Sequence, residues 1–192
     1  MEVFETRYPF MVDKYGYQPD SGGPGRFRGG MSAVTIMRPV GHDCEVGGCN
    51  DRAVIPPWGV FGGMPSLHGE NKIIRSDGSE TPIDRAGGEI ARAGDILYFR
   101  APGGGGYGDP VDRDLDYLQH DLDIGLVSRE SASRDYGAVV DEVTGSVDRQ
   151  ATEANRATLK GKWKRDEIFI DQKTQPFARK ALRIVGIDEQ IP

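Results

Sequence analysis

The segment DILYFRAPGGGGYGDP, residues 95–110, decides how the chain folds, because it joins a strand to a loop of consecutive glycines. Its first part, residues 95–101, is rich in apolar and aromatic side chains, which predicts a strand. Gly103, Gly104, Gly105 and Gly106 then give a backbone without Cβ atoms that can take either sign of φ. Such a loop can approach a ligand or another chain closely, or turn its N–H groups toward an anion.

A loop between a strand and a helix is the usual setting of phosphate-binding loops. This one matches neither G-x-x-x-x-G-K-[ST] nor G-x-G-x-x-G opening into a helix, since Asp109 and Pro110 interrupt it. We therefore favour a tight structural corner filled by Tyr107 over a nucleotide site. A role in lining a site shared with a partner stays open.

The residues before this segment are predicted to form strands and irregular loops. Phe4, Tyr8, Phe10 and Val12 lie at even spacing, so residues 1–30 read as a short strand that enters the glycine-rich stretch DSGGPGRFRGG, residues 20–30. Residues 32–40 and 71–75 are further strands, and a turn with Asp-Gly at its centre follows at 76–79. Residues 41–70 are expected to be irregular because glycine and proline are dense there.

The residues after Pro110 are predicted to be mainly helical. Val111, Leu115, Leu118 and Leu122 fall on one helical stripe over 111–124, and Gly125 is a natural helix stop. Further predictions are a helix capped by Ser128 and ending at Tyr136, a hairpin over 138–147, and a helix over 149–164 capped by Asp148. The fold class is α+β: a glycine-rich, β-dominated first half and a helical second part. Residues 1–165 are expected to form one domain and residues 166–192 a polar tail.

Composition and charge exclude several classes of protein. The chain has 192 residues, of which 27 are glycine and 12 are proline, so it is no helical bundle. Its net charge of −6 argues against nucleic acid as a partner. The sequence contains no apolar run of transmembrane length and no signal peptide, so we expect no association with a membrane. We expect a cytoplasmic location, in which the two cysteines would be reduced.

Two groups of residues are candidates for a site. Arg26 and Arg28 flank Phe27 and could bind a carboxylate or phosphate, or pair with Asp13, Asp20 or an acidic partner, with the structural pairing favoured. With the glycine loop they make up the residues expected at a substrate or subunit interface: Arg26, Arg28, Trp58, Gly103, Gly104, Gly105, Gly106 and Tyr107.

The second group is a candidate zinc site made of His42, Cys44, Cys49 and His68, because zinc is bound by such side chains on glycine-containing loops. The alternative is two free thiols and a surface histidine. No nucleophile stands beside a histidine in a recognisable pattern, and His120 is expected on the polar side of its helix. No catalytic residue is therefore assigned to this chain.

Several segments together resemble the C-terminal third of the hydantoinase B/5-oxoprolinase family, to which acetone and acetophenone carboxylase subunits are related. The matching segments follow one another through about residue 165: 5–30, 56–63, 94–114, 121–141 and 151–159. The stretch HDCEVGGCN, residues 42–50, and the residues after 165 depart from the family.

The resemblance implies a hetero-oligomeric, ATP-dependent enzyme. It implies an A-type partner that binds ATP with Mg or Mn, and a B-type N-terminal chain that holds the metal-binding Asp/His cluster. No catalytic residue is carried over, because that cluster lies in the part of the family that precedes these segments. We expect a subunit that completes the B-type component, for cyclic amide or imide hydrolysis or for ketone carboxylation. The alternatives are a zinc-stabilised assembly module and the relic of a split gene.

Overall fold

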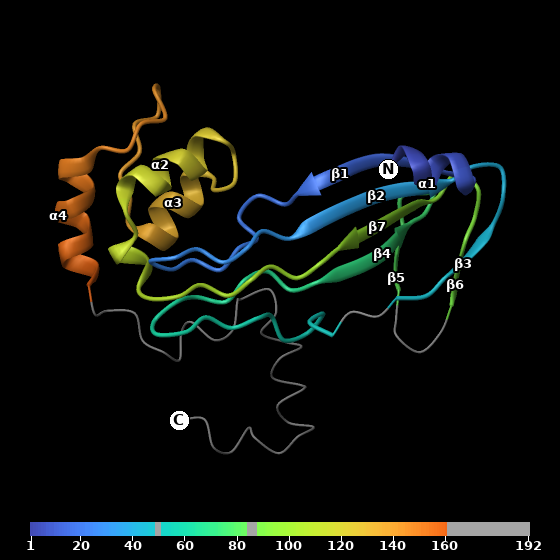
Figure 1. Cartoon of the computed structure of the whole chain (residues 1–192), viewed down its shortest axis with the longest axis horizontal. Coiled ribbons are helices and arrows are strands. Elements are labelled where there is room, and N and C mark those ends of the chain that lie inside the picture. Colours follow the sequence, from blue (N-terminus) through green and yellow to red (C-terminus); the bar gives the residue numbers. More distant parts are fainter. Residues whose placement is uncertain (49–50, 84–87, 161–192) are drawn as a thin grey trace, which may run out of the picture.

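The computed structural model describes residues 1–48, 51–83 and 88–160 of the chain. The parts follow one another along an elongated molecule (Figure 1): a small two-stranded ribbon, a five-stranded sheet, a set of extended glycine-rich loops and a group of helices. A β-dominated first half and a helical second part confirm the α+β prediction.

The main sheet is antiparallel throughout, with the strand order β1-β2-β7-β4-β5. Its strands are β1 (Phe10–Tyr17), β2 (Ala33–Pro39), β4 (Glu70–Ile74), β5 (Glu80–Pro82) and β7 (Ile96–Arg100). The predicted strands at 32–40, 71–75 and 95–101 are confirmed. The turn at 76–79 is also confirmed, with Gly78 at φ +84°.

A short ribbon of β3 (Cys44–Val46) and β6 (Glu89–Ala91) covers one end of the sheet. Ile73 and Met37 both lie opposite Leu97 on neighbouring strands, so these side chains share one sheet face. They pack with residues of the ribbon in a cluster whose buried members are Val46, Ile73, Ile83, Ala91 and Leu97. The prediction that residues 41–70 are irregular was wrong at β3, because a strand of this length has too few residues to show an alternation.

The prediction of a strand beginning near Phe4 was also wrong, since residues Glu2–Arg7 form helix α1. Phe4 and Tyr8 are four residues apart, a spacing that suits a helix face as well as a strand, and their ring centroids are 5.2 Å apart. Glu5 on this helix accepts a hydrogen bond from the backbone N–H of Val12 at 2.7 Å, which ties α1 to β1.

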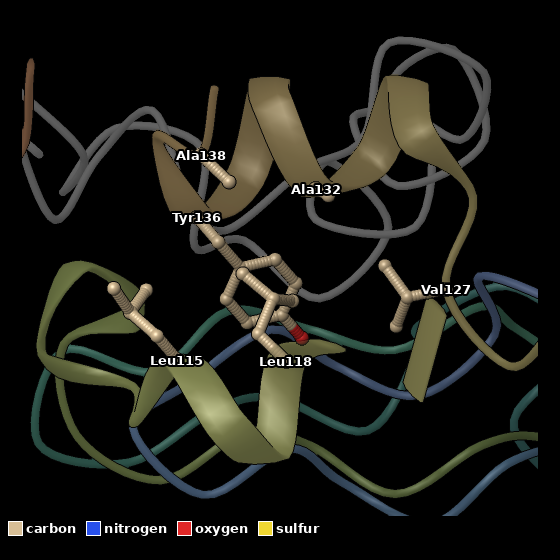
Figure 2. Close-up of a cluster of buried hydrophobic side chains, with 6 residues drawn as sticks. All are labelled: Leu115, Leu118, Val127, Ala132, Tyr136 and Ala138. Carbon is tan, nitrogen blue, oxygen red and sulfur yellow. The ribbon is translucent and has the colours of Figure 1, made fainter. Parts of the chain in front are cut away.

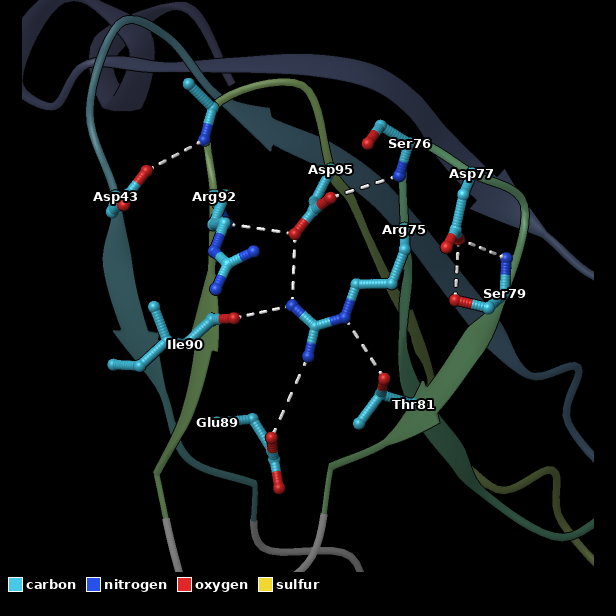
Figure 3. A network of polar contacts seen from close by, with 11 residues as sticks. Asp43, Arg75, Ser76, Asp77, Ser79, Thr81, Glu89, Ile90, Arg92 and Asp95 are labelled. Carbon is cyan, nitrogen blue, oxygen red and sulfur yellow. Dashed lines mark hydrogen bonds and ion pairs between the residues drawn. The ribbon is translucent and has the colours of Figure 1, made fainter.

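A buried carboxylate, Asp95, fastens β6 and β7 to the β4–β5 hairpin (Figure 3). Asp95 is only 3% exposed and accepts hydrogen bonds from the backbone N–H groups of Arg92 and Ser76 and from the guanidinium of Arg75. Arg75 also donates to the carbonyl of Ile90 and to the hydroxyl of Thr81. Burial by itself raises the pKa of Asp95, but the hydrogen bonds from Arg92, Arg75 and Ser76 outweigh it and leave the pKa below its usual value.

This lowered pKa predicts a loss of stability in acid. A carboxyl group whose pKa is lower in the folded than in the unfolded chain stabilises the fold above the unfolded value, and the contribution disappears as the pH falls through the folded value. Asp95→Asn should therefore lower the urea midpoint at pH 7, and the difference from the parent chain should shrink below about pH 4, near the pKa of an unfolded aspartate. A difference that stays constant between pH 7 and pH 3 would contradict this assignment.

The helical part consists of η1 (Pro110–Asp112), α2 (Leu115–Asp123), α3 (Arg129–Tyr136) and α4 (Arg149–Leu159). Ser128 and Asp148 cap α3 and α4 by accepting from the backbone N–H groups of Ser131 and Ala151, as predicted. Gly125, at φ +71°, follows α2 directly after its C-cap. No helix in the part of the chain that the structure describes is long and apolar enough to cross a membrane.

Three predictions for this part were inaccurate. Asp114 divides the predicted helix 111–124 into η1 and α2, because it caps α2 through the backbone N–H groups of Asp116 and Tyr117. The hairpin over 138–147 is reduced to one bridge between Val140 and Val147. Helix α4 ends at Leu159 rather than 164, and residues 161–164 lie outside the described ranges.

Helices α2 and α3 pack across a compact core (Figure 2). Its fully enclosed centre is formed by Leu118 and Tyr136, which are 0% and 1% exposed, and Figure 2 shows the two side chains facing each other from α2 and α3. The remaining buried members are Leu115, Val127, Ala132 and Ala138. Burial raises the pKa of the Tyr136 phenol far above its usual value, so this side chain stays neutral.

Leu118→Ala is expected to lower the free energy of unfolding by about 2–5 kcal/mol, because it removes buried methyl groups and leaves a cavity. Val143→Ala is the control, since Val143 is 91% exposed and its truncation should change stability by less than about 0.5 kcal/mol. Urea unfolding of both variants measures the difference. Equal effects would mean that Leu118 does not occupy a packed core.

Candidate functional site

Three glycine-rich segments, residues 21–30, 57–67 and 102–108, run side by side between the sheet and the helices (Figure 1). We call them together the glycine block. Each pair of segments is joined by backbone hydrogen bonds: Gly23 N to Gly104 O at 2.8 Å, Val60 N to Gly106 O at 2.9 Å, and Met64 N to Pro24 O at 2.7 Å. The three segments therefore pack backbone against backbone.

Glycine is required in this block because the backbones touch where side chains would start. A Cβ atom on Gly29 would lie 1.8 Å from the carbonyl oxygen of Gly104. At Gly105 and Gly106 it would lie 1.9 Å from the carbonyl oxygens of Trp58 and Pro24. Real Cβ atoms essentially never approach another atom within 3.0 Å. The density of glycine in the sequence thus reflects close packing of three chain segments.

Three of the four amides of the glycine loop, and that of Tyr107, are occupied within the block. Gly103, Gly104, Gly106 and Tyr107 donate their N–H groups to the carbonyls of Leu67, Gly30, Met64 and Phe27. These donors are not turned toward a ligand, so they offer no phosphate cradle. The geometry is that of a structural corner.

Aromatic side chains stand on the surface of the block. Tyr107 forms an antiparallel bridge with Phe27 and a parallel one with Val60. Its ring centroid lies 6.2 Å from that of Phe27 and 5.2 Å from that of Phe61. Phe27, Phe61 and Tyr107 are 56%, 77% and 50% exposed, and we call them the aromatic cluster. Tyr107 marks the corner, as predicted, but its ring is half exposed and does not fill the interior.

The two arginines beside Phe27 have different surroundings. Arg28 is largely buried and binds Asp121 of α2 through both carboxylate oxygens, at 3.0 and 3.1 Å. Arg26 is exposed, with its guanidinium 5.6 Å from the centre of the Phe27 ring, and no carboxylate within the described ranges pairs with it. The suggested partners Asp13 and Asp20 are used elsewhere: Asp13 pairs with Arg38, and Asp20 accepts from the backbone N–H of Ser128.

The remaining interface candidate, Trp58, lies on the same block. Its carbonyl packs against Gly105, while its ring is 51% exposed and carries the guanidinium of Arg52 at 4.8 Å from its centre. The structure therefore gathers Arg26, Trp58 and Tyr107 at the surface of the glycine block. It separates them from Arg28, which serves the junction with the helices.

The candidate zinc ligands form no metal-binding group within the described residues. Nδ1 of His42 lies 3.1 Å from the carbonyl of Val40, and Nδ1 of His68 lies 2.8 Å from that of Gly69. Cys44 is a free thiol in β3 whose pKa is raised by burial and by Asp43, whereas zinc binds the thiolate. Cys49 lies outside the described residues. Within them, no group of three or more His, Cys, Asp or Glu side chains could hold a metal, so zinc binding is unsupported.

Two features of the block were not predicted. Phe27 and Phe61 were not identified as an exposed cluster, although the sequence signal exists: each aromatic ring lies in a loop of glycines without a strand or helix period. Asp121 was not identified as the partner of Arg28, because the two are 93 residues apart. Its only signal is a carboxylate next to Leu122 on the apolar stripe of α2.

Comparison with protein families shows what the chain is similar to. The family described as hydantoinase B/oxoprolinase matches residues 1–110. The caprolactamase subunit beta of Pseudomonas jessenii is 36% identical over 162 residues, which are 82% of this chain and 28% of that protein. 5-Oxoprolinase 1 of Arabidopsis thaliana is 33% identical over 113 residues, which are 57% of this chain and 9% of that protein.

Solved structures share the fold. The ATP-dependent caprolactamase of Pseudomonas jessenii superposes with a TM-score of 0.66 at 31% identity, over 81% of this chain and 28% of that chain. A nucleotide-free acetone carboxylase shares the fold alone, with a TM-score of 0.63 at 21% identity over 97% of this chain and 29% of that chain. The chain spans 24–28% of the length of curated relatives that it matches over most of its own length. Because the family matches residues 1–110, more than half of the chain, and a curated relative is 36% identical over 82% of it, the chain belongs to the hydantoinase B/oxoprolinase family.

Proposed function

We propose that the chain forms the C-terminal part of the B-type component of an ATP-dependent enzyme that hydrolyses a cyclic amide or imide. The observation that carries this proposal is the likeness to the ATP-dependent caprolactamase, which combines a TM-score of 0.66 with 31% identity over 81% of the chain. The acetone carboxylase shares the fold at 21% identity, so ketone carboxylation is the second reaction to test.

In this proposal the chain completes the B-type component and does not catalyse alone. His42 and His68 bind backbone carbonyls, and His120 is exposed on α2 as predicted. The acidic and phenolic groups with altered pKa values in the cores, Asp95 and Tyr136, hold the fold together. ATP and its Mg or Mn ion would bind to an A-type partner. The Asp/His cluster that binds a metal would belong to the B-type N-terminal region.

The test is an assembly isolated through a tag on this chain from its own source. We expect it to contain an A-type ATP-binding component and a B-type N-terminal region, identified by mass spectrometry. It should release phosphate from ATP when ε-caprolactam, 5-oxoproline or hydantoin is added, whereas the purified chain alone should not. Phosphate release that requires acetone and bicarbonate would assign the carboxylation instead. Turnover by the chain alone, or no ATP hydrolysis with any of these compounds, would overturn the proposal.

A further inference from the structure

The aromatic cluster is an apolar surface that the described residues leave open. Phe27, Phe61 and Tyr107 are each at least half exposed, and Val60 beside them is 47% exposed. Exposed aromatic side chains that touch one another are typical of protein interfaces, where they act as anchors. The backbone beneath them is held by hydrogen bonds between Phe27 and Tyr107 in both directions, at 3.0 and 2.9 Å, so the rings stand on a fixed base.

Phe61 adds a second observation, because its backbone is strained. Its φ is +53°, a region that bulky residues rarely occupy, and yet its ring is 77% exposed. Burial in this chain does not explain why a phenylalanine is kept in a conformation suited to glycine. Strained residues of this kind are found at binding surfaces, where the strain fixes a side chain in position.

The edge of the surface carries a positive charge at Arg26. Its guanidinium lies 5.6 Å from the centre of the Phe27 ring, and no carboxylate among the described residues forms an ion pair with it. A two-fold contact with a second copy would bring the same patch, with the same positive edge, against itself. Like charges brought together in this way oppose association, so a different surface that carries carboxylates fits better.

We propose that the aromatic cluster docks onto the rest of the B-type component, against an apolar depression edged by carboxylates. This inference rests on the proposed function. It is favoured because the matched region is only 28% of the caprolactamase chain, so most of the B-type polypeptide is available to cover this face. Phe61 is the central anchor, and Arg26 orients the contact.

Phe61→Gly tests the docking without harming the fold, since glycine accepts a positive φ and removes the ring. When the assembly is isolated through the tag, the amount of B-type N-terminal region recovered with Phe61→Gly should be about tenfold lower than with the parent chain. Arg26→Glu should also lower this amount. Tyr117→Ser is the matched control, because Tyr117 is a 64% exposed aromatic residue on α2 and is not part of the aromatic cluster. Tyr117→Ser should recover as much B-type N-terminal region as the parent chain does. The urea midpoint of Phe61→Gly should equal or exceed that of the parent chain, which shows that the fold is intact.

A photo-crosslinking phenylalanine analogue at position 61 identifies the occupant. Crosslinked peptides from the B-type N-terminal region support the proposal. Peptides from the A-type component, from a second copy of this chain, or none at all in an intact assembly would overturn the docking inference alone. If the parent chain isolates no B-type region, the proposed function and the docking surface fall together.

Discussion

Gly29→Ala is expected to lower the free energy of unfolding by about 4 kcal/mol or more, whereas Gly30→Ala should leave it nearly unchanged. The added Cβ at position 29 would lie 1.8 Å from the carbonyl oxygen of Gly104, 2.4 Å from its carbonyl carbon and 2.8 Å from the carbonyl oxygen of Gly105. All three are backbone atoms, so no rotamer change can relieve the contact. The two segments would have to separate, and their hydrogen bonds would break with them.

Gly30 is the matched control, because it is the next residue in the same segment. It is exposed, its φ is not in the left-handed region, and a Cβ there would meet nothing within 4 Å. Alanine at such a site restricts the unfolded chain and can even stabilise the fold by up to about 1 kcal/mol. Urea unfolding of the two variants compares them directly. Similar losses at both positions would show that the three segments do not touch as described.

Local sequence patterns predict some secondary-structure elements of this fold and miss others. Strands β2, β4 and β7 and the caps Ser128 and Asp148 follow from local patterns, because a run of apolar residues or a capping oxygen acts within a few residues. Helix α1 was misassigned because the spacing of Phe4 and Tyr8 satisfies both periods. Strands β3 and β6 exist only because each pairs with the other, which a local pattern does not contain.

The site was predicted as a list of residues and not as an arrangement. Four consecutive glycines indicate that another part of the chain can pack closely against their backbone, but they do not indicate which part. In the structure, residues 21–30 and 57–67 pack against them. A lone Phe61 between glycines gives no sign of its neighbours, since Tyr107 lies far along the chain. Asp121 pairs with Arg28 only because the helices pack against the glycine block, and the sequence near either residue does not show this packing. Local patterns therefore predict segments, while the contacts between distant segments decide the surface.

The second large effect concerns Asp121, the carboxylate that joins the glycine block to the helices. It is 4% exposed and binds two guanidinium groups, that of Arg28 at 3.0 and 3.1 Å and that of Arg113 at 2.5 Å. Arg113 is 7% exposed and lies with its guanidinium 5.8 Å from the centre of the Tyr136 ring. One buried negative charge thus compensates two positive ones at the junction.

Asp121→Asn should therefore lower the free energy of unfolding by about 3–5 kcal/mol, because it keeps the shape of the side chain but leaves two buried cations without a counter-charge. Asp116→Asn is the control on the same helix: its ion pair with Arg149 is exposed on both sides, and such pairs contribute about 1 kcal/mol or less. Removing Arg28 as well should recover part of the loss, since Arg28→Met takes away one of the two uncompensated charges. A double variant as unstable as the sum of the single ones would show that Arg28 and Asp121 act independently, and the glycine block would then be held to the helices by contacts other than this pair.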